Sequence, residues 1–178
     1  MPEPSRVPAL PGQARLPGKH FWAWLGLAAL IVGLDQWSKW YFDTHLFYQE
    51  RWNVLPFFDF TLLYNPGAAF SFLAGGQGWQ RWFFVGIAFV ATVLILTMLR
   101  RSAGQPLFCL SLSLILGGAV GNVVDRLQHG HVVDFLLFYW NQSYFPAFNI
   151  ADVAITCGAI LLILDEFLRM RRNKRQGA

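Results

Sequence analysis

Gly121-Asn122-Val123-Val124-Asp125-Arg126 ends one long apolar window of the sequence, and Phe148-Asn149-Ile150-Ala151-Asp152 begins the next. Between them lies His131-Val132-Val133-Asp134-Phe135, a third place where an acidic residue stands among apolar ones. A carboxylate beside hydrocarbon costs at least about 2.5 kcal/mol, so an acidic residue found there is a candidate for function. Two carboxylates held close together share one proton, an arrangement suited to acid–base hydrolysis. Asp134 and Asp152 are therefore the first candidates for a catalytic pair.

The composition indicates a membrane protein. The 178 residues are 55% hydrophobic and only 13% charged, with a mean hydropathy of +0.39, which is too apolar for an ordinary soluble domain. Each of four apolar windows can cross about 30 Å of hydrocarbon as a helix: 21–41, 79–99, 107–124 and 150–168. No small-residue cleavage site follows the first window, so we interpret it as a retained span and not as a signal peptide. The sequence predicts an all-α membrane protein, a four-transmembrane-helix bundle.

The basic residues orient these spans. Most of the 14 Lys and Arg residues precede the first window, lie between the second and third, or follow the fourth. By the positive-inside rule, both termini and the loop 100–106 are cytoplasmic. All ionisable residues within or bordering the spans, apart from the cytoplasmic flanks, then lie at the outer boundary of the membrane. A transporter would instead carry polar residues through the whole depth and show inverted repeats, and we find neither in the sequence.

The segments outside the spans have different characters. We expect residues 43–78 to form an outer, strand-rich segment: apolar and polar residues alternate over 58–65, a turn follows at Asn65-Pro66-Gly67, and 68–73 could return as a second strand. We expect a small sheet that rests on the membrane surface. Residues 1–20 are expected to be a proline-rich, disordered cytoplasmic lead. The basic tail 169–178 is expected to face anionic lipid and not nucleic acid.

Five motifs, in order, carry a resemblance to the lipoprotein signal peptidase family (signal peptidase II) over roughly residues 21–168. They are Asp35-Gln36-x-x-Lys39, Asn65-x-Gly67-Ala68-Ala69-Phe70, Gly118-x-x-Gly121-Asn122-x-x-Asp125-Arg126, Val133-Asp134-Phe135 and Phe148-Asn149-x-Ala151-Asp152. The resemblance implies a membrane aspartic endopeptidase of the bacterial cytoplasmic (inner) membrane. Such an enzyme removes the signal peptide from diacylglyceryl-modified prolipoproteins, on the amino side of the modified cysteine.

The resemblance also implies the site and its setting. Asp134 and Asp152 match the catalytic dyad of the family, at the outer face of the membrane. Four transmembrane helices with an outer β-cradle are implied, with neither cofactor nor metal, and with sensitivity to the cyclic peptide globomycin. We further expect the chain to act as a monomer. The residues predicted to bind substrate or support the site are Asp35, Lys39, Asn65, Gly67, Asn122, Asp125, Arg126 and Asn149.

Each acidic candidate also has a structural interpretation. Asp152 follows Asn149 by three residues, so it could be the acidic member of a helix N-terminal cap. Asp134 could be a solvated loop acid, although its neighbours are apolar. Asp125 and Arg126 are expected to form a structural ion pair that braces the site.

Other predicted residues have structural interpretations as well. Asp35 and Lys39 have the i,i+4 spacing of an intrahelical ion pair, with the lysine snorkelling to the surface. The three asparagines could satisfy backbone groups or hold the substrate backbone extended, and the sequence leaves both open. Asp43 and Asp59 lie outside every motif, so we expect their change to Asn to have little effect.

Two other hydrolytic chemistries compete with the aspartyl one. His129-x-His131-x-x-Asp134 could bind zinc, but it lacks the helical spacing that supplies ligands and base together. A serine–lysine pair would need Ser38 beside Lys39, and adjacent helical positions face different ways.

In the aspartyl mechanism, the ionised aspartate takes a proton from water and the protonated one donates a hydrogen bond to the oxyanion. The sequence does not say which is which. Substrate would reach the site laterally, between helices.

Overall fold

The computed structural model describes residues 19–67, 78–102 and 104–176, which form a mostly helical chain with a small antiparallel sheet. The helices are α1 (Lys19–His45), α2 (Trp79–Arg101), α3 (Pro106–His129) and α4 (Ile150–Gln176), and the strands are β1 (Arg51–Leu55), β2 (Phe58–Asn65), β3 (Val132–Trp140) and β4 (Ser143–Tyr144). Each predicted window is helical and begins close to the predicted residue. The helices continue beyond the windows at their carboxyl ends because polar residues such as Asp125 and Arg126 prolong a helix after its apolar stretch has finished.

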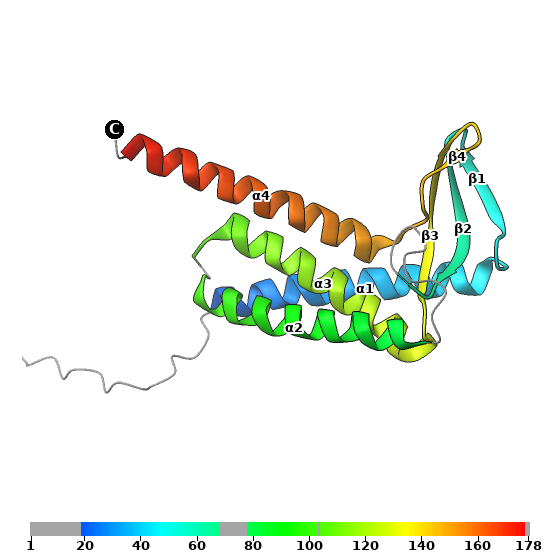
Figure 1. Cartoon of the computed structure of the whole chain (residues 1–178), viewed down its shortest axis with the longest axis horizontal. Coiled ribbons are helices and arrows are strands. Elements are labelled where there is room, and N and C mark those ends of the chain that lie inside the picture. The colour runs from blue at the N-terminus through cyan, green and yellow to red at the C-terminus, as the bar shows by residue number, and fades with distance from the viewer. Residues whose placement is uncertain (1–18, 68–77, 103, 177–178) are drawn as a thin grey trace, which may run out of the picture.

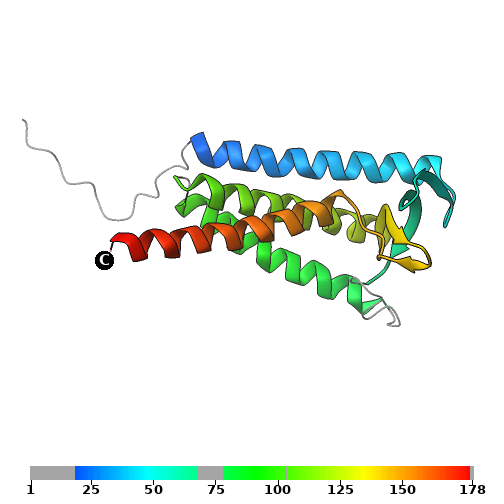
Figure 2. The same cartoon turned by 90° about the horizontal axis from the view of Figure 1, so that it is seen from above.

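Helix α3 is the centre of the bundle. It packs against α1, α2 and α4, and Figures 1 and 2 show the four helices running alongside one another, with α2 and α4 on opposite sides of α3. Small residues on α3 permit this. A Cβ added at Gly117 would lie 2.7 Å from the side chain of Ile31 on α1, and one at Gly118 would overlap the carbonyl oxygen of Ala151 on α4. Glycine at these positions therefore sets how closely the helices approach.

The bundle exposes apolar side chains to its surroundings. Helices α2 and α3 are long and apolar enough to cross a membrane, and only 11% of the most apolar window of α2 is buried by the rest of the protein. Large exposed side chains lie on the other helices too, among them Trp37 and Trp40 on α1 and Ile160 and Ile163 on α4. An outward-facing apolar surface of this kind is what lipid contacts require.

A four-stranded sheet lies at one end of the bundle, with its strands across the helix axes and in the order β1-β2-β3-β4 (Figure 1). The sequence predicts strand β2 over 58–65 but does not predict β3, since it indicates no strand between the third and fourth apolar windows. The prediction failed because the first residues of β3 are buried in unbroken succession, which removes the alternation that marks a half-exposed strand. The predicted return strand 68–73 and residues 1–18 of the predicted lead lie outside the described residues. Lys19 and His20, assigned to that lead, begin α1.

An aromatic cluster fixes the sheet on the bundle. Phe42 near the end of α1 stacks on Phe135 of β3, with ring centroids 4.4 Å apart, and Leu62 of β2 is buried beside them. The segment after β4 then pairs with the outer side of β3: the backbone N–H of Phe148 donates to the carbonyl of Leu136 at 3.1 Å, and the N–H of Leu136 donates back at 2.9 Å. This pairing places the start of α4 beside Asp134.

Candidate active site

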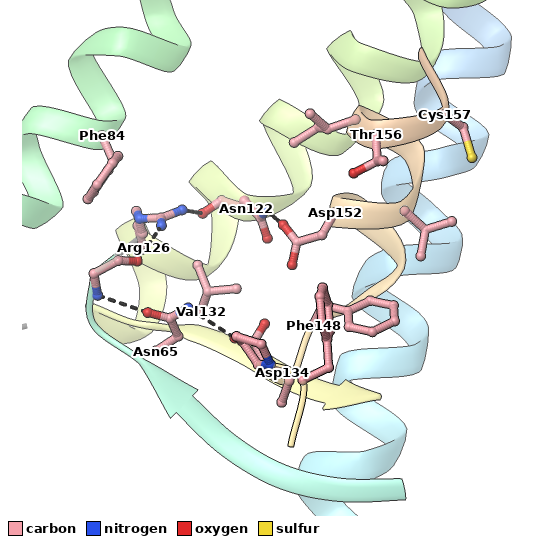
Figure 3. A pocket seen from close by; sticks show the side chains of 16 residues that line it. Asn65, Phe84, Asn122, Arg126, Val132, Asp134, Phe148, Asp152, Thr156 and Cys157 are labelled. Atoms are coloured by element: carbon pink, nitrogen blue, oxygen red, sulfur yellow. Dashed lines mark hydrogen bonds between the residues drawn. The ribbon is translucent and has the colours of Figure 1, made fainter. Parts of the chain in front are cut away.

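Asp134 and Asp152 face one cavity of about 520 Å³ on the side of α3 between α2 and α4 (Figure 3). Asp134 comes from β3 and is 3% exposed, while Asp152 comes from the first turn of α4 and is half-buried. Six of the ten predicted site residues line this cavity: Asn65, Gly67, Asn122, Arg126, Asp134 and Asp152. The other four, which are Asp35, Lys39, Asp125 and Asn149, are buried behind it. The predicted site residues therefore form one site.

Asn149 links the two carboxylates. Its side-chain N–H donates to Asp134 Oδ1 at 2.7 Å, and its backbone N–H donates to Asp152 Oδ2 at 3.3 Å. In return, Asn149 Oδ1 accepts the backbone N–H of Asp152 at 3.0 Å. The last two bonds form a capping box, in which the residue before the helix and the third residue within it satisfy each other's N–H groups. The interpretation of Asp152 as a cap is thus confirmed, and the cap holds the carboxylate at the cavity.

Asn65, the last residue of β2, binds the second carboxylate oxygen of Asp134. Asn65 Nδ2 donates to Asp134 Oδ2 at 3.1 Å, and Asn65 Oδ1 accepts the backbone N–H of Gly67 at 3.0 Å. Arg126 donates to the carbonyls of Gly67, at 3.2 Å, and Asn122, at 3.1 Å. Its guanidinium lies 4.9 Å from the ring centroid of Phe84 on α2. One arginine thus joins the turn after β2 to α3 at the edge of the cavity.

An ion cluster lies behind the cavity. Lys39 Nζ is 2.8 Å from Asp35 Oδ2 and 2.9 Å from Asp125 Oδ2, and it donates to Asn122 Oδ1 at 2.9 Å. The predicted pair of Asp35 and Lys39 is confirmed, but Lys39 is only 3% exposed and does not snorkel. The expected pair of Asp125 and Arg126 is wrong. Adjacent residues on a helix do not face each other, so Asp125 points to α1 and takes Lys39 as its ion partner.

The surroundings of Asp134 favour its protonated form. The pKa of Asp134 is raised from 3.8 to about 7, chiefly because the carboxyl is buried and also because of the neighbouring charge of Asp152, while the amides of Asn65 and Asn149 and the charge of Lys39 act in the opposite direction. Asp134 is therefore not a solvated loop acid. A buried carboxyl that holds a proton near neutral pH, beside a second carboxylate at a cavity, is suited to acid–base chemistry.

Comparison with known proteins agrees with this geometry. The family model described as signal peptidase (SPase) II matches residues 27–168. The chain belongs to the signal peptidase II family. The lipoprotein signal peptidase of Cupriavidus necator is 55% identical over 150 residues, covering 84% of this chain and 86% of that protein. That of Neisseria gonorrhoeae is 50% identical over 157 residues, covering 88% of this chain and 94% of that protein.

A solved structure is similar as well. It is that of a bacterial membrane enzyme determined by the in meso method, with a TM-score of 0.76 and 31% identity, and the match covers 85% of this chain and 91% of that one. With its apolar helices, this member of the signal peptidase II family is a bacterial membrane protein.

The two competing chemistries find little support in the geometry of this signal peptidase II family member. Among the described residues, no three His, Cys, Asp or Glu side chains are arranged to hold a metal ion. The ring of His131 packs on Tyr64 at a centroid distance of 4.4 Å, and its centroid lies 6.0 Å from that of His129. Ser38 donates its hydroxyl to the carbonyl of Asp35 in its own helix at 2.8 Å, so it is not paired with Lys39 as a nucleophile.

Two polar residues have buried structural roles in this signal peptidase II family member that the sequence analysis did not predict. Gln36 donates to Asp125 Oδ1 at 2.6 Å and to the carbonyl of Gly121 at 3.1 Å, and its place within the first motif was the signal available. Asp59, expected to matter little, is 2% exposed and accepts hydrogen bonds from Asn53 at 2.8 Å and Tyr139 at 3.1 Å, besides its ion pair with Arg51. Asp59 therefore braces the sheet, and only Asp43 remains suitable as a neutral control.

Proposed function

We propose that this chain is a membrane aspartic endopeptidase that removes the signal peptide from diacylglyceryl-modified prolipoproteins, with Asp134 and Asp152 as its catalytic pair. Cleavage would fall on the amino side of the lipid-modified cysteine. The observation that carries the proposal is the cavity itself, because both carboxylates face it and Asn149 joins them behind it. Membership of the signal peptidase II family supplies the substrate class.

The two carboxylates have different roles in this proposal. Asp152 is half-buried and accepts N–H groups from Asn122 and the backbone of Asn149, so we assign it the role of the base. It takes a proton from the water that attacks the scissile carbonyl carbon. Asp134 keeps its proton and donates a hydrogen bond to the oxyanion that develops. When the tetrahedral intermediate collapses, the C–N bond breaks and Asp152 gives its proton to the leaving amino group.

The position of the cavity suits a substrate that stays partly in lipid. Apolar side chains from α2 and α4, including Phe84, Val153 and Ile155, line the side of the cavity away from the sheet. We propose that the substrate arrives laterally between α2 and α4, with its apolar segment and acyl chains in lipid and the scissile bond at the carboxylates.

All four helices would cross the inner membrane, with both termini cytoplasmic, the sheet as a β-cradle and the site at the outer face. We also propose that the chain acts as a monomer, and we expect inhibition by globomycin.

Cleavage of a diacylglyceryl prolipoprotein by the purified protein, followed by gel shift, tests this function. The Asp134→Asn and Asp152→Asn variants should each lower turnover per folded molecule by about 10²- to 10⁴-fold, since each removes a titrating group used in the transition state. The double variant should be little worse than either single one, because the pair acts as a unit.

The matched control is Asp43→Asn, whose carboxylate contacts Tyr64 at 2.8 Å outside the site. It should cleave normally, with and without a chelator. Near-normal turnover of Asp134→Asn or Asp152→Asn would overturn the aspartyl mechanism. Loss of wild-type cleavage with chelator would replace it with a metal-dependent one.

A further inference from the structure

Lys39 is a buried cation whose hydrogen bonds are all directed at oxygen atoms of the ion cluster. An ammonium has three N–H donors and no acceptor, and Lys39 Nζ has three partners: Asp35 Oδ2 at 2.8 Å, Asp125 Oδ2 at 2.9 Å and Asn122 Oδ1 at 2.9 Å. Lys39 does not line the cavity. The charge of Lys39 lowers the pKa of Asp134 directly, and any other effect that it has on the reaction must pass through one of these partners.

Each partner of Lys39 contacts a segment that carries a catalytic aspartate. Asp35 Oδ1 accepts the backbone N–H of Ala151 at 2.9 Å, immediately before Asp152. Asp125 Oδ2 accepts the backbone N–H of Val133 at 3.1 Å, immediately before Asp134. The two carboxylates thus balance the charge of the lysine and anchor β3 and α4 around it.

The third partner, Asn122, contacts a catalytic carboxylate directly. Asn122 Nδ2 donates to Asp152 Oδ1 at 2.8 Å (Figure 3). Because an ammonium can only donate, the Asn122 atom that faces Lys39 must be the oxygen. Asn149 Nδ2 also points at that oxygen, at 3.4 Å. A flipped amide would set N–H against N–H on one side and oxygen against carboxylate on the other, so the lysine fixes which way the amide points.

We propose that Lys39 is a positioning residue for the reaction: through Asn122, its ammonium keeps an N–H donor aimed at the Asp152 carboxylate. This inference rests on the proposed function of the two aspartates. The donor holds the Asp152 carboxylate in one orientation, in which it can accept a proton from the attacking water. The other charged groups around this carboxylate are Asp134 from β3 and Arg126 from α3.

The test is a kinetic cycle on the full-length protein in detergent, with a diacylglyceryl prolipoprotein as substrate. Lys39→Met should lower kcat on the order of 10²-fold with little change in KM, because a misplaced catalytic group slows chemistry without removing substrate contacts. Asn122→Ala should show the same loss of kcat and a similarly unchanged KM.

The decisive comparison is the double variant Lys39→Met/Asn122→Ala. If Lys39 acts through Asn122, its loss should have little further effect on kcat once Asn122 is gone. Losses of kcat that multiply in the double variant would overturn the inference, and so would a folded Lys39→Met protein with normal kcat. Lys174→Met, the same change at an exposed lysine of α4, should behave as wild type.

A second pair keeps the inference testable if Lys39→Met does not accumulate, as the loss of one buried charge can prevent folding. Lys39→Met/Asp125→Asn leaves Asp35 as the one charge of the cluster, so the net charge stays at minus one as in the wild type. The kcat of this double variant should be lower than that of Asp125→Asn by the same factor, on the order of 10²-fold, that is expected for Lys39→Met. If the double variant and Asp125→Asn had equal kcat, the inference would be overturned. If Asp134→Asn and Asp152→Asn abolish cleavage while Lys39 proves neutral, only this inference fails.

Discussion

At the scale of single residues, the surroundings of Asp134 keep its carboxyl protonated near neutral pH, as the proposed mechanism requires. Burial raises its pKa to about 7, and the charge of Asp152 acts in the same direction. The hydrogen bonds from Asn65 and Asn149 limit the rise because amide N–H groups favour the ionised carboxylate. As pH passes through 7, Asp134 loses its proton and can no longer donate to an oxyanion. The proposed mechanism therefore predicts that kcat/KM falls on the alkaline side, with a midpoint near pH 7.

Changing Asn65 should move that midpoint in a defined direction. Asn65→Ala removes a donor to Asp134 Oδ2, so the pKa of Asp134 should rise further and the alkaline limb of kcat/KM should shift to higher pH. The measurement is the pH profile of prolipoprotein cleavage, with Asn173→Ala, an exposed asparagine of α4, as the matched control. An alkaline limb that stays in place or moves to lower pH would contradict the assignment of the proton to Asp134.

At the scale of the elements, the small residues of α3 place both halves of the site. Gly121 leaves room for the ion cluster, since a Cβ there would lie 2.5 Å from Asp35 Oδ2. Gly118 lets the first turn of α4 lie against α3, over the carbonyl of Ala151, the residue before Asp152. The same contacts that bring α1, α3 and α4 together thus determine where the carboxylates stand.

Comparing Gly118→Ala with Gly33→Ala should distinguish the effect of helix packing on stability from the effect of helix propensity. The added methyl must push α4 away, so we expect a loss of about 1–3 kcal/mol in the free energy of unfolding and reduced cleavage by the protein that still folds. Gly33→Ala on α1 adds the same methyl in open space and should be neutral or stabilising by up to about 1 kcal/mol. Unfolding in detergent measures both. Equal unfolding free energies for the two variants would show that the approach of α4 to α3 does not depend on this glycine.

At the scale of the whole molecule, the sheet and the site lie at one end of the bundle, whereas the loop between α2 and α3 and the end of α4 lie at the other (Figure 1). Single cysteines placed at Gln49 and Gln142 should react with a membrane-impermeant reagent from outside the cell. Cysteines at Arg100 and Arg172 should react only after the membrane is opened. The background should lack the two free thiols, of which Cys157 is exposed. Labelling of Gln142 and Arg172 from the same side would contradict the four-span arrangement.

Much of the helical bundle could be predicted from its apolar windows, and Asp134 and Asp152 stood out as candidates among them, whereas the other eight proposed site residues rest on the family motifs. Apolar windows mark helices that face lipid, and a polar residue stands out within or beside them. What the sequence did not reveal depends on residues distant along the chain. Strand β3 is covered on both faces, so its sequence carries no alternation. The partner of Asp125 depends on the rotation of α3 against α1, which brings Lys39 of another helix to it and leaves Arg126 facing elsewhere.

The capping box at the start of α4 has a pharmacological consequence. One oxygen of Asp152 already accepts a hydrogen bond from the backbone of Asn149, so a molecule that engages that oxygen competes with the protein's own helix cap. The binding free energy of such a molecule is reduced by the free energy needed to break the hydrogen bond from the Asn149 N–H to Asp152. A compound that offers a carbonyl of its own to the Asn149 N–H avoids this competition, whereas one directed at Asp152 Oδ1 meets another, since that oxygen accepts from Asn122 at 2.8 Å. Inhibitors built on a peptide backbone can provide such a carbonyl, whereas simple carboxylate-binding groups cannot.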